Sequence, residues 1–301
     1  MSNIILLFAC LILGVVLRHS GRLPDSAPAA FNGFILHVAL PALILLQIHA
    51  VRLDPSLLFP IAMPWLLFLI GGGFFWLLGR VLRFSRETTG ALMIAGGLAN
   101  TSFVGLPMIE AFYGRGDMAI GIVVDQLGTY LVLSTVGIAV ISFYAGGAAR
   151  PGGVLRRVVT FPPLIALVVA VACLQLDYPP WLTDVLRRLG ETLAPLALVS
   201  VGLQLRLGDL QGNRRALAGG LAFKLAIGPL AVLAIYVGLL HAHGEAIRVT
   251  LFESAMGPQI GGAIVASQSG LNPPLISLLV AIGITLSFAT LPVWWYVLQA
   301  V

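Results

Sequence analysis

Long apolar runs separated by short polar loops dominate this chain. Ten of the runs are long enough to cross about 30 Å of hydrocarbon as helices. The first begins almost at Met1, without a basic segment or a small-residue cleavage site, so it is predicted to be a membrane span and not a signal peptide. The pattern predicts an all-α integral membrane protein with spans at residues 2–17, 31–50, 57–79, 89–112, 118–144, 161–177, 189–206, 216–240, 246–268 and 274–298.

Two of the predicted spans are interrupted near their centres by a proline among small and polar residues. The fourth contains Asn-Thr-Ser-Phe-Val-Gly-Leu-Pro at 100–107, and the ninth contains Glu-Ser-Ala-Met-Gly-Pro-Gln at 253–259. A break inside the bilayer leaves backbone amides and carbonyls without partners, which costs several kcal/mol per group in lipid. Such breaks therefore lie where protein or a watery cavity surrounds them, and a matched pair indicates a transporter's substrate site.

The ten spans divide into two halves of five, residues 1–149 and 150–301. Each half ends in a broken span followed by an uninterrupted one. Because five is odd, the second half is inverted relative to the first. An inverted repeat places the two broken helices across a pseudo-two-fold axis near the bilayer midplane.

Composition supports the membrane interpretation. The chain is 59% hydrophobic and 10% charged, whereas soluble domains contain about 25% charged residues. The sequence pI of about 9.7 does not indicate nucleic-acid binding, because the arginines lie in the short loops between spans. Cys10 and Cys173 both fall in apolar spans, so no disulfide framework or metal-binding cysteine pair is expected.

The loop arginines predict the orientation in the membrane. Cytoplasmic loops carry an excess of basic residues. Eleven arginines follow the odd-numbered spans, and five lie on the opposite side, so both termini are predicted outside the cytoplasm. The first set is Arg18, Arg22, Arg80, Arg83, Arg86, Arg150, Arg156, Arg157, Arg206, Arg214 and Arg215, and the second is Arg52, Arg115, Arg187, Arg188 and Arg248.

The two breaks predict a site for an anion. Each creates a half-helix N-terminus with free amides and about half a positive charge, and two such ends facing one cavity favour a carboxylate. An alternative is that the polar side chains merely satisfy the broken backbone. The predicted substrate-binding residues are Asn100, Thr101, Ser102, Gly105, Pro107, Met256, Gly257, Pro258 and Gln259.

Ionisable residues inside the spans are the second signal, because buried charges in a membrane usually pair or line a pathway. Asp125, with Gln126 beside it, and Lys224 lie at depths that overlap. They form either a buried structural pair or a coupling site for H⁺ or Na⁺, and Glu253 joins the same group. No cofactor and no metal-ligand cluster is predicted.

Several segments together resemble the auxin efflux carrier family. The segments, which extend over nearly the whole chain, are Gly-Leu-Ala-Asn-Thr-Ser-Phe-Val-Gly-Leu-Pro (97–107), Val-Asp-Gln-Leu-Gly-Thr (124–129), Val-Gly-Leu-Gln-Leu-Arg-Leu (201–207), Phe-Lys-Leu-Ala-Ile-Gly-Pro (223–229), and the stretch from Glu253 to Pro292. This family includes bacterial organic-acid permeases, such as malonate carriers, and the plant PIN-FORMED auxin exporters.

The resemblance implies a fold similar to sodium/proton antiporters and bile-acid symporters. Spans 1, 2, 6 and 7 would form a scaffold and spans 3–5 and 8–10 a transport unit, crossing at Pro107 and Pro258. It also implies a homodimer in the bacterial inner membrane and elevator-type alternating access. Gly257 departs from the proline often found there, and the chain lacks the long cytoplasmic loop of the plant exporters.

The expected function is therefore secondary transport of small organic anions, either mono- or dicarboxylates, malonate-like or auxin-like. Alternatives are a cation- or proton-coupled antiporter, a bile-acid-like sodium symporter, or a channel on the same fold. An enzyme is not expected, since the chain contains no HExxH, GxSxG or phosphate-loop motif. The expected partners are the carboxylate, the lipid bilayer and a second copy of the chain.

Overall fold

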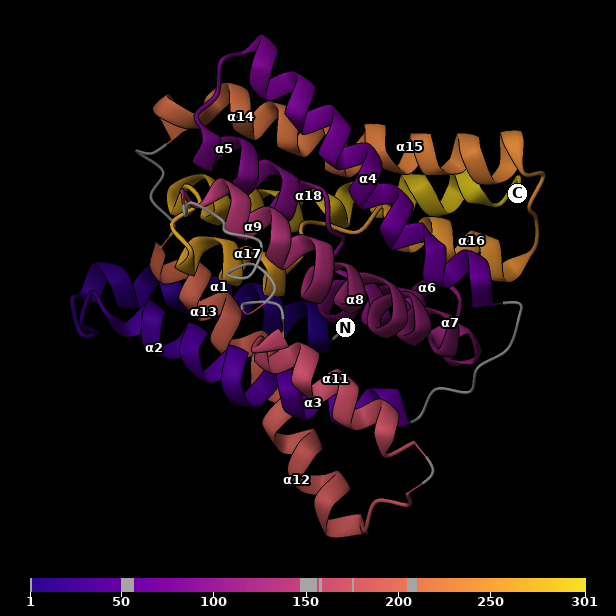
Figure 1. Cartoon of the computed structure of the whole chain (residues 1–301), viewed down its shortest axis with the longest axis horizontal. Helices are drawn as coiled ribbons and strands as arrows, with labels where there is room; N and C mark the ends of the chain where they lie inside the picture. The colour runs from indigo at the N-terminus through magenta and orange to yellow at the C-terminus, as the bar shows by residue number, and fades with distance from the viewer. Residues whose placement is uncertain (1, 50–56, 147–155, 157–158, 175, 205–209) are drawn as a thin grey trace. The chain divides into compact units, whose positions relative to one another are not determined.

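The structure is a computed structural model that describes residues 2–49, 57–146, 156, 159–174, 176–204 and 210–301 (Figure 1). Within these residues every regular element is a helix, and the only β-type pairing is one bridge between Ala99 and Pro258. The prediction of an all-helical protein is confirmed.

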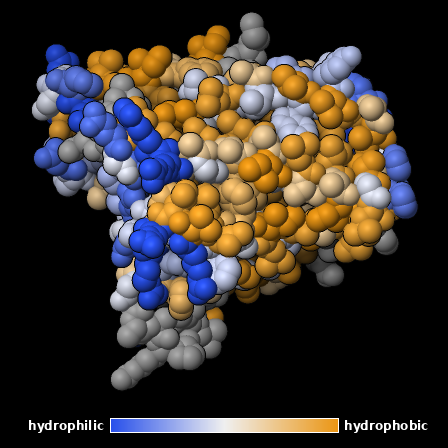
Figure 2. Space-filling model, turned by 90° about the horizontal axis from the view of Figure 1, so that it is seen from above, coloured by the Kyte–Doolittle hydropathy of each residue, from blue (hydrophilic) through white to orange (hydrophobic). Residues whose placement is uncertain are grey.

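Five described helical segments are long and apolar enough to span a bilayer: Ala27–Leu46, Leu58–Val81, Met118–Tyr144, Leu210–Leu239 and Pro273–Leu298. Large apolar side chains on them are exposed, among them Leu69 at 65% and Val293 at 63%. Figure 2 shows a face on which hydrophobic residues cover a broad area and hydrophilic residues gather at its margins. An exposed apolar surface of this extent marks an interface with protein or with a membrane. Five apolar helices of spanning length indicate the membrane, as expected.

Contacts divide the chain into two units. The first consists of Met1–Arg52 with Ala148–Leu205, and the second of Leu53–Gly147 with Arg206–Val301. Each unit thus combines segments from both halves of the sequence. The helices of the first unit are α1 (Ser2–Ser20), α2 (Ala27–Phe34), the π-helical η1 (Ile35–Ala39), α3 (Leu40–His49), α11 (Pro162–Ala172), α12 (Pro180–Glu191) and α13 (Leu193–Gln204).

The first unit is built on the contact between α1 and α13, which lie side by side in Figure 1. Glycines allow this approach, since a Cβ added to Gly14 would lie 2.9 Å from the Cα atom of Gly202. Small residues at helix contacts are typical of membrane proteins because they let two backbones pack closely. The Ser200 hydroxyl also bonds to the Asn32 side chain on α2 at 2.7 Å.

The sixth and seventh predicted spans differ from the structure. The helix expected over 161–177 ends at Ala172, which gives about 16 Å at 1.5 Å per residue. The expected loop before residue 189 is instead the amphipathic α12, which packs on α3. Its apolar residues recur at helical spacing between charged ones, so a criterion based on average hydropathy misses it. The count of ten spans and the inverted repeat remain predictions.

The second unit contains both interrupted spans. One consists of α5 (Arg86–Ala91) with η3 (Leu92–Gly96), followed after a gap by η4 (Thr101–Gly105) with α6 (Leu106–Phe112); the other consists of α16 (Glu245–Ser254) and α17 (Ile260–Gln268). The rest of the unit is α4 (Leu58–Val81), η5 (Arg115–Asp117), α7 (Met118–Val123), η6 (Val124–Thr129), α8 (Tyr130–Val132), η7 (Leu133–Gly137), α9 (Ile138–Tyr144), α14 (Leu210–Ala222), η9 (Phe223–Ile227), α15 (Gly228–Leu233), η10 (Ala234–Leu239) and α18 (Pro273–Leu298).

The position of the first break corrects the prediction. Pro107 lies in the first turn of α6, inside a helix that runs without a gap from Thr101 to Phe112. The chain leaves helical geometry earlier, at Gly97–Asn100. Pro107 is tolerated because proline in the first turn of a helix removes few hydrogen bonds, and the preceding π-helical turn already shifts the pairing, with the Gly105 amide bonding to the Asn100 carbonyl. In the second interrupted span, Pro258 does lie in the break.

The predicted orientation depends on the loop arginines of both sides. Four of those counted, Arg52, Arg150, Arg157 and Arg206, lie outside the described residues. The placement of both termini outside the cytoplasm stays a prediction.

Candidate functional site at the crossing of two interrupted helices

The two breaks meet inside the second unit and pair through one isolated antiparallel bridge. The Asn100 amide donates to the Gly257 carbonyl at 2.8 Å, and the Gln259 amide donates to the Leu98 carbonyl at 3.2 Å. These bonds flank the bridge between Ala99 and Pro258. Each break thereby supplies hydrogen-bond partners to the other, which is how non-helical backbone is tolerated at membrane depth.

Asn100 begins the half-helix formed by η4 and α6. Its Oδ1 atom accepts from the amides of Phe103 (3.2 Å) and Val104 (3.3 Å), so the side chain caps the helix. Its Nδ2 atom is buried and has no hydrogen-bond partner among the described residues. Asn100 therefore combines both sequence-based interpretations, because one end of the amide satisfies the broken backbone and the other is a donor left unused.

Gln259 stands at the corresponding start of α17. Its backbone is extended, its side chain caps no amide, and its Oε1 atom is buried without a partner among the described residues. A Cβ added to Gly262 would lie 3.0 Å from that oxygen, so a glycine in the first turn leaves room for the side chain. The first-turn amides of α17 are therefore not satisfied by a side-chain cap.

Asp125 lies on η6 among hydrogen-bond donors. The Thr101 hydroxyl donates to Oδ1 at 2.5 Å, and Nε2 of Gln126 donates to Oδ2 at 2.6 Å. Ser102 is a further hydrogen-bonding neighbour. All of these side chains are buried. The carboxylate of one helix thus holds the first turn of the interrupted helix in place.

Lys224 and Asp125 do not form an ion pair, which was one of the two alternatives that the sequence left open. The structure contains no salt bridge within 4 Å between these two residues. The Lys224 ammonium instead donates to the Ser254 carbonyl at 2.9 Å, at the C-terminal end of α16. A cation suits this position because the end of a helix carries partial negative charge and free carbonyls. The sequence showed the depth of the lysine but not its partner.

Glu253, next to that carbonyl, is fully buried and points toward the first interrupted span. A Cβ added to Gly105 would lie 2.5 Å from its Oε2 atom, and one added to Gly121 would lie 3.1 Å from Oε1. Neither carboxyl oxygen has a hydrogen-bond partner in the part of the chain that the structure describes. Gly105 therefore makes space for a carboxyl group, and its contact with substrate stays a prediction.

The remaining predicted residues line the crossing itself. Met256 is fully buried, and a Cβ added to Gly257 would lie 3.1 Å from the Cα atom of Ile284 on α18. The glycine at 257 is thus explained by the close approach of α18. The prediction omitted Thr129, whose hydroxyl lies 3.2 Å from that of Thr101. Its spacing of four residues from Asp125, which places both on one helix face, was the signal available.

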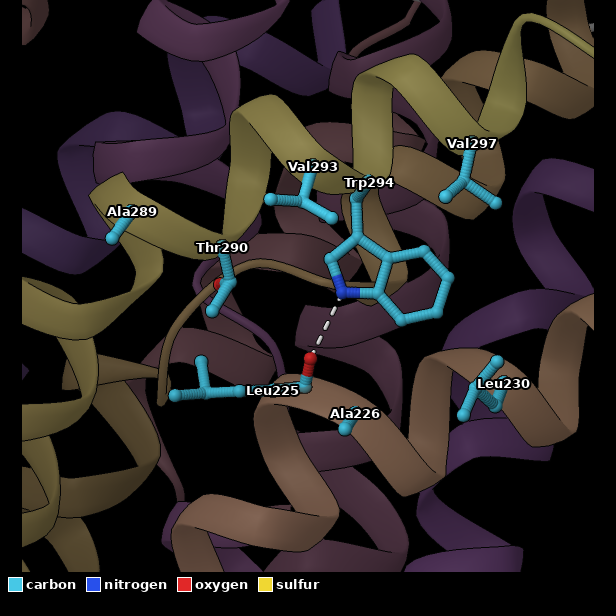
Figure 3. Close-up of a pocket in the computed structure, with 8 residues that line it drawn as sticks. All are labelled: Leu225, Ala226, Leu230, Ala289, Thr290, Val293, Trp294 and Val297. Carbon is cyan, nitrogen blue, oxygen red and sulfur yellow. Dashed lines mark hydrogen bonds between the residues drawn. The ribbon is translucent and has the colours of Figure 1, made fainter.

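Two pockets in the structure lie away from the crossing. One, of about 390 Å³, is lined by η9, α15 and α18 (Figure 3). Its lining residues are apolar except Thr290 and Trp294, and the indole nitrogen of Trp294 donates to the Leu225 carbonyl at 2.9 Å. Pro229 provides no amide for that carbonyl four residues earlier, so the indole replaces it. The other, of about 830 Å³, lies in the first unit and includes Arg188 and Glu191.

Comparison with known proteins gives the family. The profile described as "Membrane transport protein" matches residues 1–149 and 152–295, nearly the whole chain. This chain belongs to the membrane transport protein family. The match confirms the resemblance to auxin efflux carriers, and a transporter family agrees with the expectation that the protein is not an enzyme.

Two proteins similar to this membrane transport protein come from archaea. An uncharacterized transporter of Methanothermobacter thermautotrophicus is 27% identical over 307 residues, covering 99% of this chain and 98% of the relative. An uncharacterized transporter of Methanocaldococcus jannaschii is 23% identical over 317 residues, with the same coverage of both chains. The similarity therefore extends over the full length of these membrane transport proteins and includes both interrupted spans.

Proposed function

We propose that this membrane transport protein is a secondary transporter of small organic anions, mono- or dicarboxylates, that bind at the crossing of the two interrupted helices. The observation that supports this most directly is the unused, buried donor Nδ2 of Asn100 beside two half-helix N-termini. Amide donors and helix N-termini favour a negatively charged group. Thr101, Ser102, Gly257, Pro258 and Gln259 would form the rest of the site.

The proposal includes alternating access of the elevator type. The unit that contains Leu53–Gly147 and Arg206–Val301 holds both interrupted helices and the buried charged residues. The described residues of the other unit include neither. This division supports a transport unit of spans 3–5 and 8–10 and a scaffold of spans 1, 2, 6 and 7. A homodimer formed through the scaffold, in the bacterial inner membrane with both termini outside the cytoplasm, completes the proposal.

A binding screen with Asn100→Asp tests the site. Aspartate keeps an acceptor oxygen for the amides of Phe103 and Val104 but replaces the Nδ2 donor with a second oxygen. We expect acetate, malonate or succinate at 100 times its dissociation constant to stabilise the wild-type protein by about 2.7 kcal/mol, and the variant not at all. Thermal unfolding of the purified protein measures both.

Asn272→Asp is the matched control. Asn272 caps α18 with Oδ1 and donates from Nδ2 to Thr88 and Asn213. It lies beyond the C-terminal end of α17, whereas the crossing is at the N-terminal end of that helix. We expect this variant to lose some stability but to keep the ligand-induced shift. A shift of wild-type size in Asn100→Asp would contradict the proposed site.

Counterflow in proteoliposomes distinguishes a carrier from a channel. A carrier binds substrate on one side at a time, so unlabelled carboxylate inside the vesicle is expected to accelerate entry of labelled carboxylate. A channel would give no such acceleration. The same assay with an imposed sodium gradient or pH gradient identifies the coupling ion.

A further inference from the structure

We propose that Glu253 is the proton-binding group of this transporter, while Asp125 stays ionised as a fixed structural anion. The proposal rests on the proposed function for its consequence in transport, but its chemistry follows from the surroundings of the two carboxyl groups. Both are fully buried in the same unit, and they differ in the hydrogen-bond donors around them.

Asp125 is surrounded by donors. Thr101, Gln126 and Ser102 all direct hydrogen-bonding groups at its carboxylate. Donors to the charged form favour ionisation, and several of them can hold a carboxylate ionised even when it is buried. Thr101 donates to Oδ1 and Gln126 donates to Oδ2. In the ionised form both carboxylate oxygens of Asp125 can accept these hydrogen bonds.

Glu253 has the opposite surroundings. Neither oxygen receives a hydrogen bond within the described residues, and Gly105 and Gly121, which carry no side chain, leave space beside it. A buried carboxylate without donors is strongly disfavoured, and in practice such a group takes up a proton. The absence of side chains at 105 and 121 gives the carboxyl group space to be hydrogen-bonded by water or by a substrate in another state.

Charge balance leads to the same assignment. Asp125 and Lys224 are the charged groups that act on Glu253. With Lys224 charged and bound to the Ser254 carbonyl, one ionised carboxylate makes the buried cluster neutral and two make it negative. Two carboxylates within each other's field do not both stay ionised in a dry site, so the proton resides on the one that lacks donors.

The ring of Tyr113 lies 5.3 Å from that of Phe252 on α16, and this tyrosine interacts with Arg248 and Asp117. Among the described residues, the helices packed against α16 add no other acid or base at the depth of Glu253. η4, α7 and α15 contain no titratable side chain, Arg80 is in the last turn of α4, and Tyr296 on α18 is 76% exposed. On α16 itself, Glu245 and Arg248 lie toward its start and interact with Asp117. The charge of Glu253 therefore depends on Asp125, on Lys224, and on the water or substrate that enters the crossing.

The proton binds to and leaves a carboxyl oxygen of Glu253. When water reaches Glu253, the O–H bond breaks heterolytically, the electron pair stays on the carboxylate, and water takes the proton. Protonation from the other side of the membrane reverses the step. No oxidant, reductant or metal ion takes part.

Infrared spectroscopy of the purified full chain in nanodiscs tests the assignment without any substrate. At neutral pH exposed carboxyl groups are ionised, so the C=O stretch of a protonated buried carboxyl, which shifts on deuteration, is distinct. We expect this band in the wild-type protein, its loss in Glu253→Gln, and its retention in the exposed control Glu245→Gln. Its absence from the wild type, or its retention in Glu253→Gln, would overturn the assignment.

A second variant distinguishes loss of the carboxyl group from loss of the folded structure. Glu253→Asp keeps a carboxyl group but shortens it, so the band should persist at a shifted frequency. Because glutamine replaces a neutral acid with a neutral amide of the same shape, Glu253→Gln is expected to unfold at the temperature of the wild type. A large drop in that temperature would mean that the ionised form is the native one and would also count against the proposal.

A transport assay tests this inference separately from the proposed function. In proteoliposomes, uptake of labelled malonate by the wild type should rise with an imposed pH gradient, and Glu253→Gln should lose that rise. Stimulation by a sodium gradient alone would overturn proton binding as the coupling step. If wild-type protein moves no carboxylate, the proposed function fails, while the infrared band still decides whether Glu253 binds the proton.

Discussion

Replacement of Lys224 with methionine is expected to lower the free energy of unfolding by about 3–5 kcal/mol. Methionine fills a similar volume but offers no charge and no donor. The Ser254 carbonyl then loses the ammonium that bonds to it at 2.9 Å, and the buried acidic groups Asp125 and Glu253 lose their nearby cation. An uncompensated charge and an unsatisfied carbonyl in a dry interior both destabilise the folded state.

Denaturation of the purified protein with increasing sodium dodecyl sulfate in mixed micelles measures this loss. Arg214→Met is the matched control, because Arg214 is a cation on the adjacent α14 but is exposed. A surface substitution of this kind is expected to change stability by no more than about 0.5 kcal/mol. If Lys224→Met also stayed within that range, the ammonium would have no structural role at the end of α16.

The second large effect is expected at Gly283, where α18 passes the crossing. A Cβ added there would lie 2.6 Å from Cδ and 2.7 Å from Cγ of Pro258. The Pro258 ring cannot move away freely, because its neighbours Gly257 and Gln259 are held by backbone hydrogen bonds to the first break. Gly283→Val is therefore expected to destabilise the protein by about 1–3 kcal/mol through overpacking, and to abolish both ligand-induced stabilisation and counterflow.

Gly73→Val supplies the control for that substitution. Gly73 also lies within a long apolar helix, α4, but nothing lies within 4 Å of a Cβ built on it. The valine should be accommodated on this exposed face with transport retained. Normal counterflow in Gly283→Val would show that the crossing tolerates displacement of Pro258, and the geometry proposed for the site would then be wrong.

The two misplaced features of the sequence prediction have a common cause. Pro107 was taken as the point of interruption because proline breaks helices, yet it occupies the first turn of α6, where it is compatible with the helix. Likewise, the segment that forms α12 was expected to be a loop because charged residues lower its average hydropathy. In both places the local composition was identified correctly, but the conformation depends on what the segment packs against.

Side-chain partners were the least predictable part of the site. Depth along a helix indicated that Asp125, Lys224 and Glu253 could lie at similar levels, but rotation about each helix axis decides which groups meet. Lys224 bonds to a backbone carbonyl, and Asp125 bonds to a threonine and a glutamine. A hydrophobic span carries little periodic signal to fix that rotation, since lipid and protein neighbours are both apolar.

The sequence alone determined the class of this protein, since long apolar runs with few charges are stable only in a bilayer, and its motifs were sufficient to indicate the family. It also located the two interrupted segments, because glycine, proline and short polar residues are costly in lipid unless they are enclosed. Only the tertiary structure decided that Ala99 pairs with Pro258, that Asn100 has one end bonded and one end unused, and that Glu253 faces Gly105 and Gly121. The contacts of Ala99 with Pro258 and of Glu253 with Gly105 and Gly121 join residues more than a hundred positions apart. Such pairings depend on packing in three dimensions, which local periodicity does not encode.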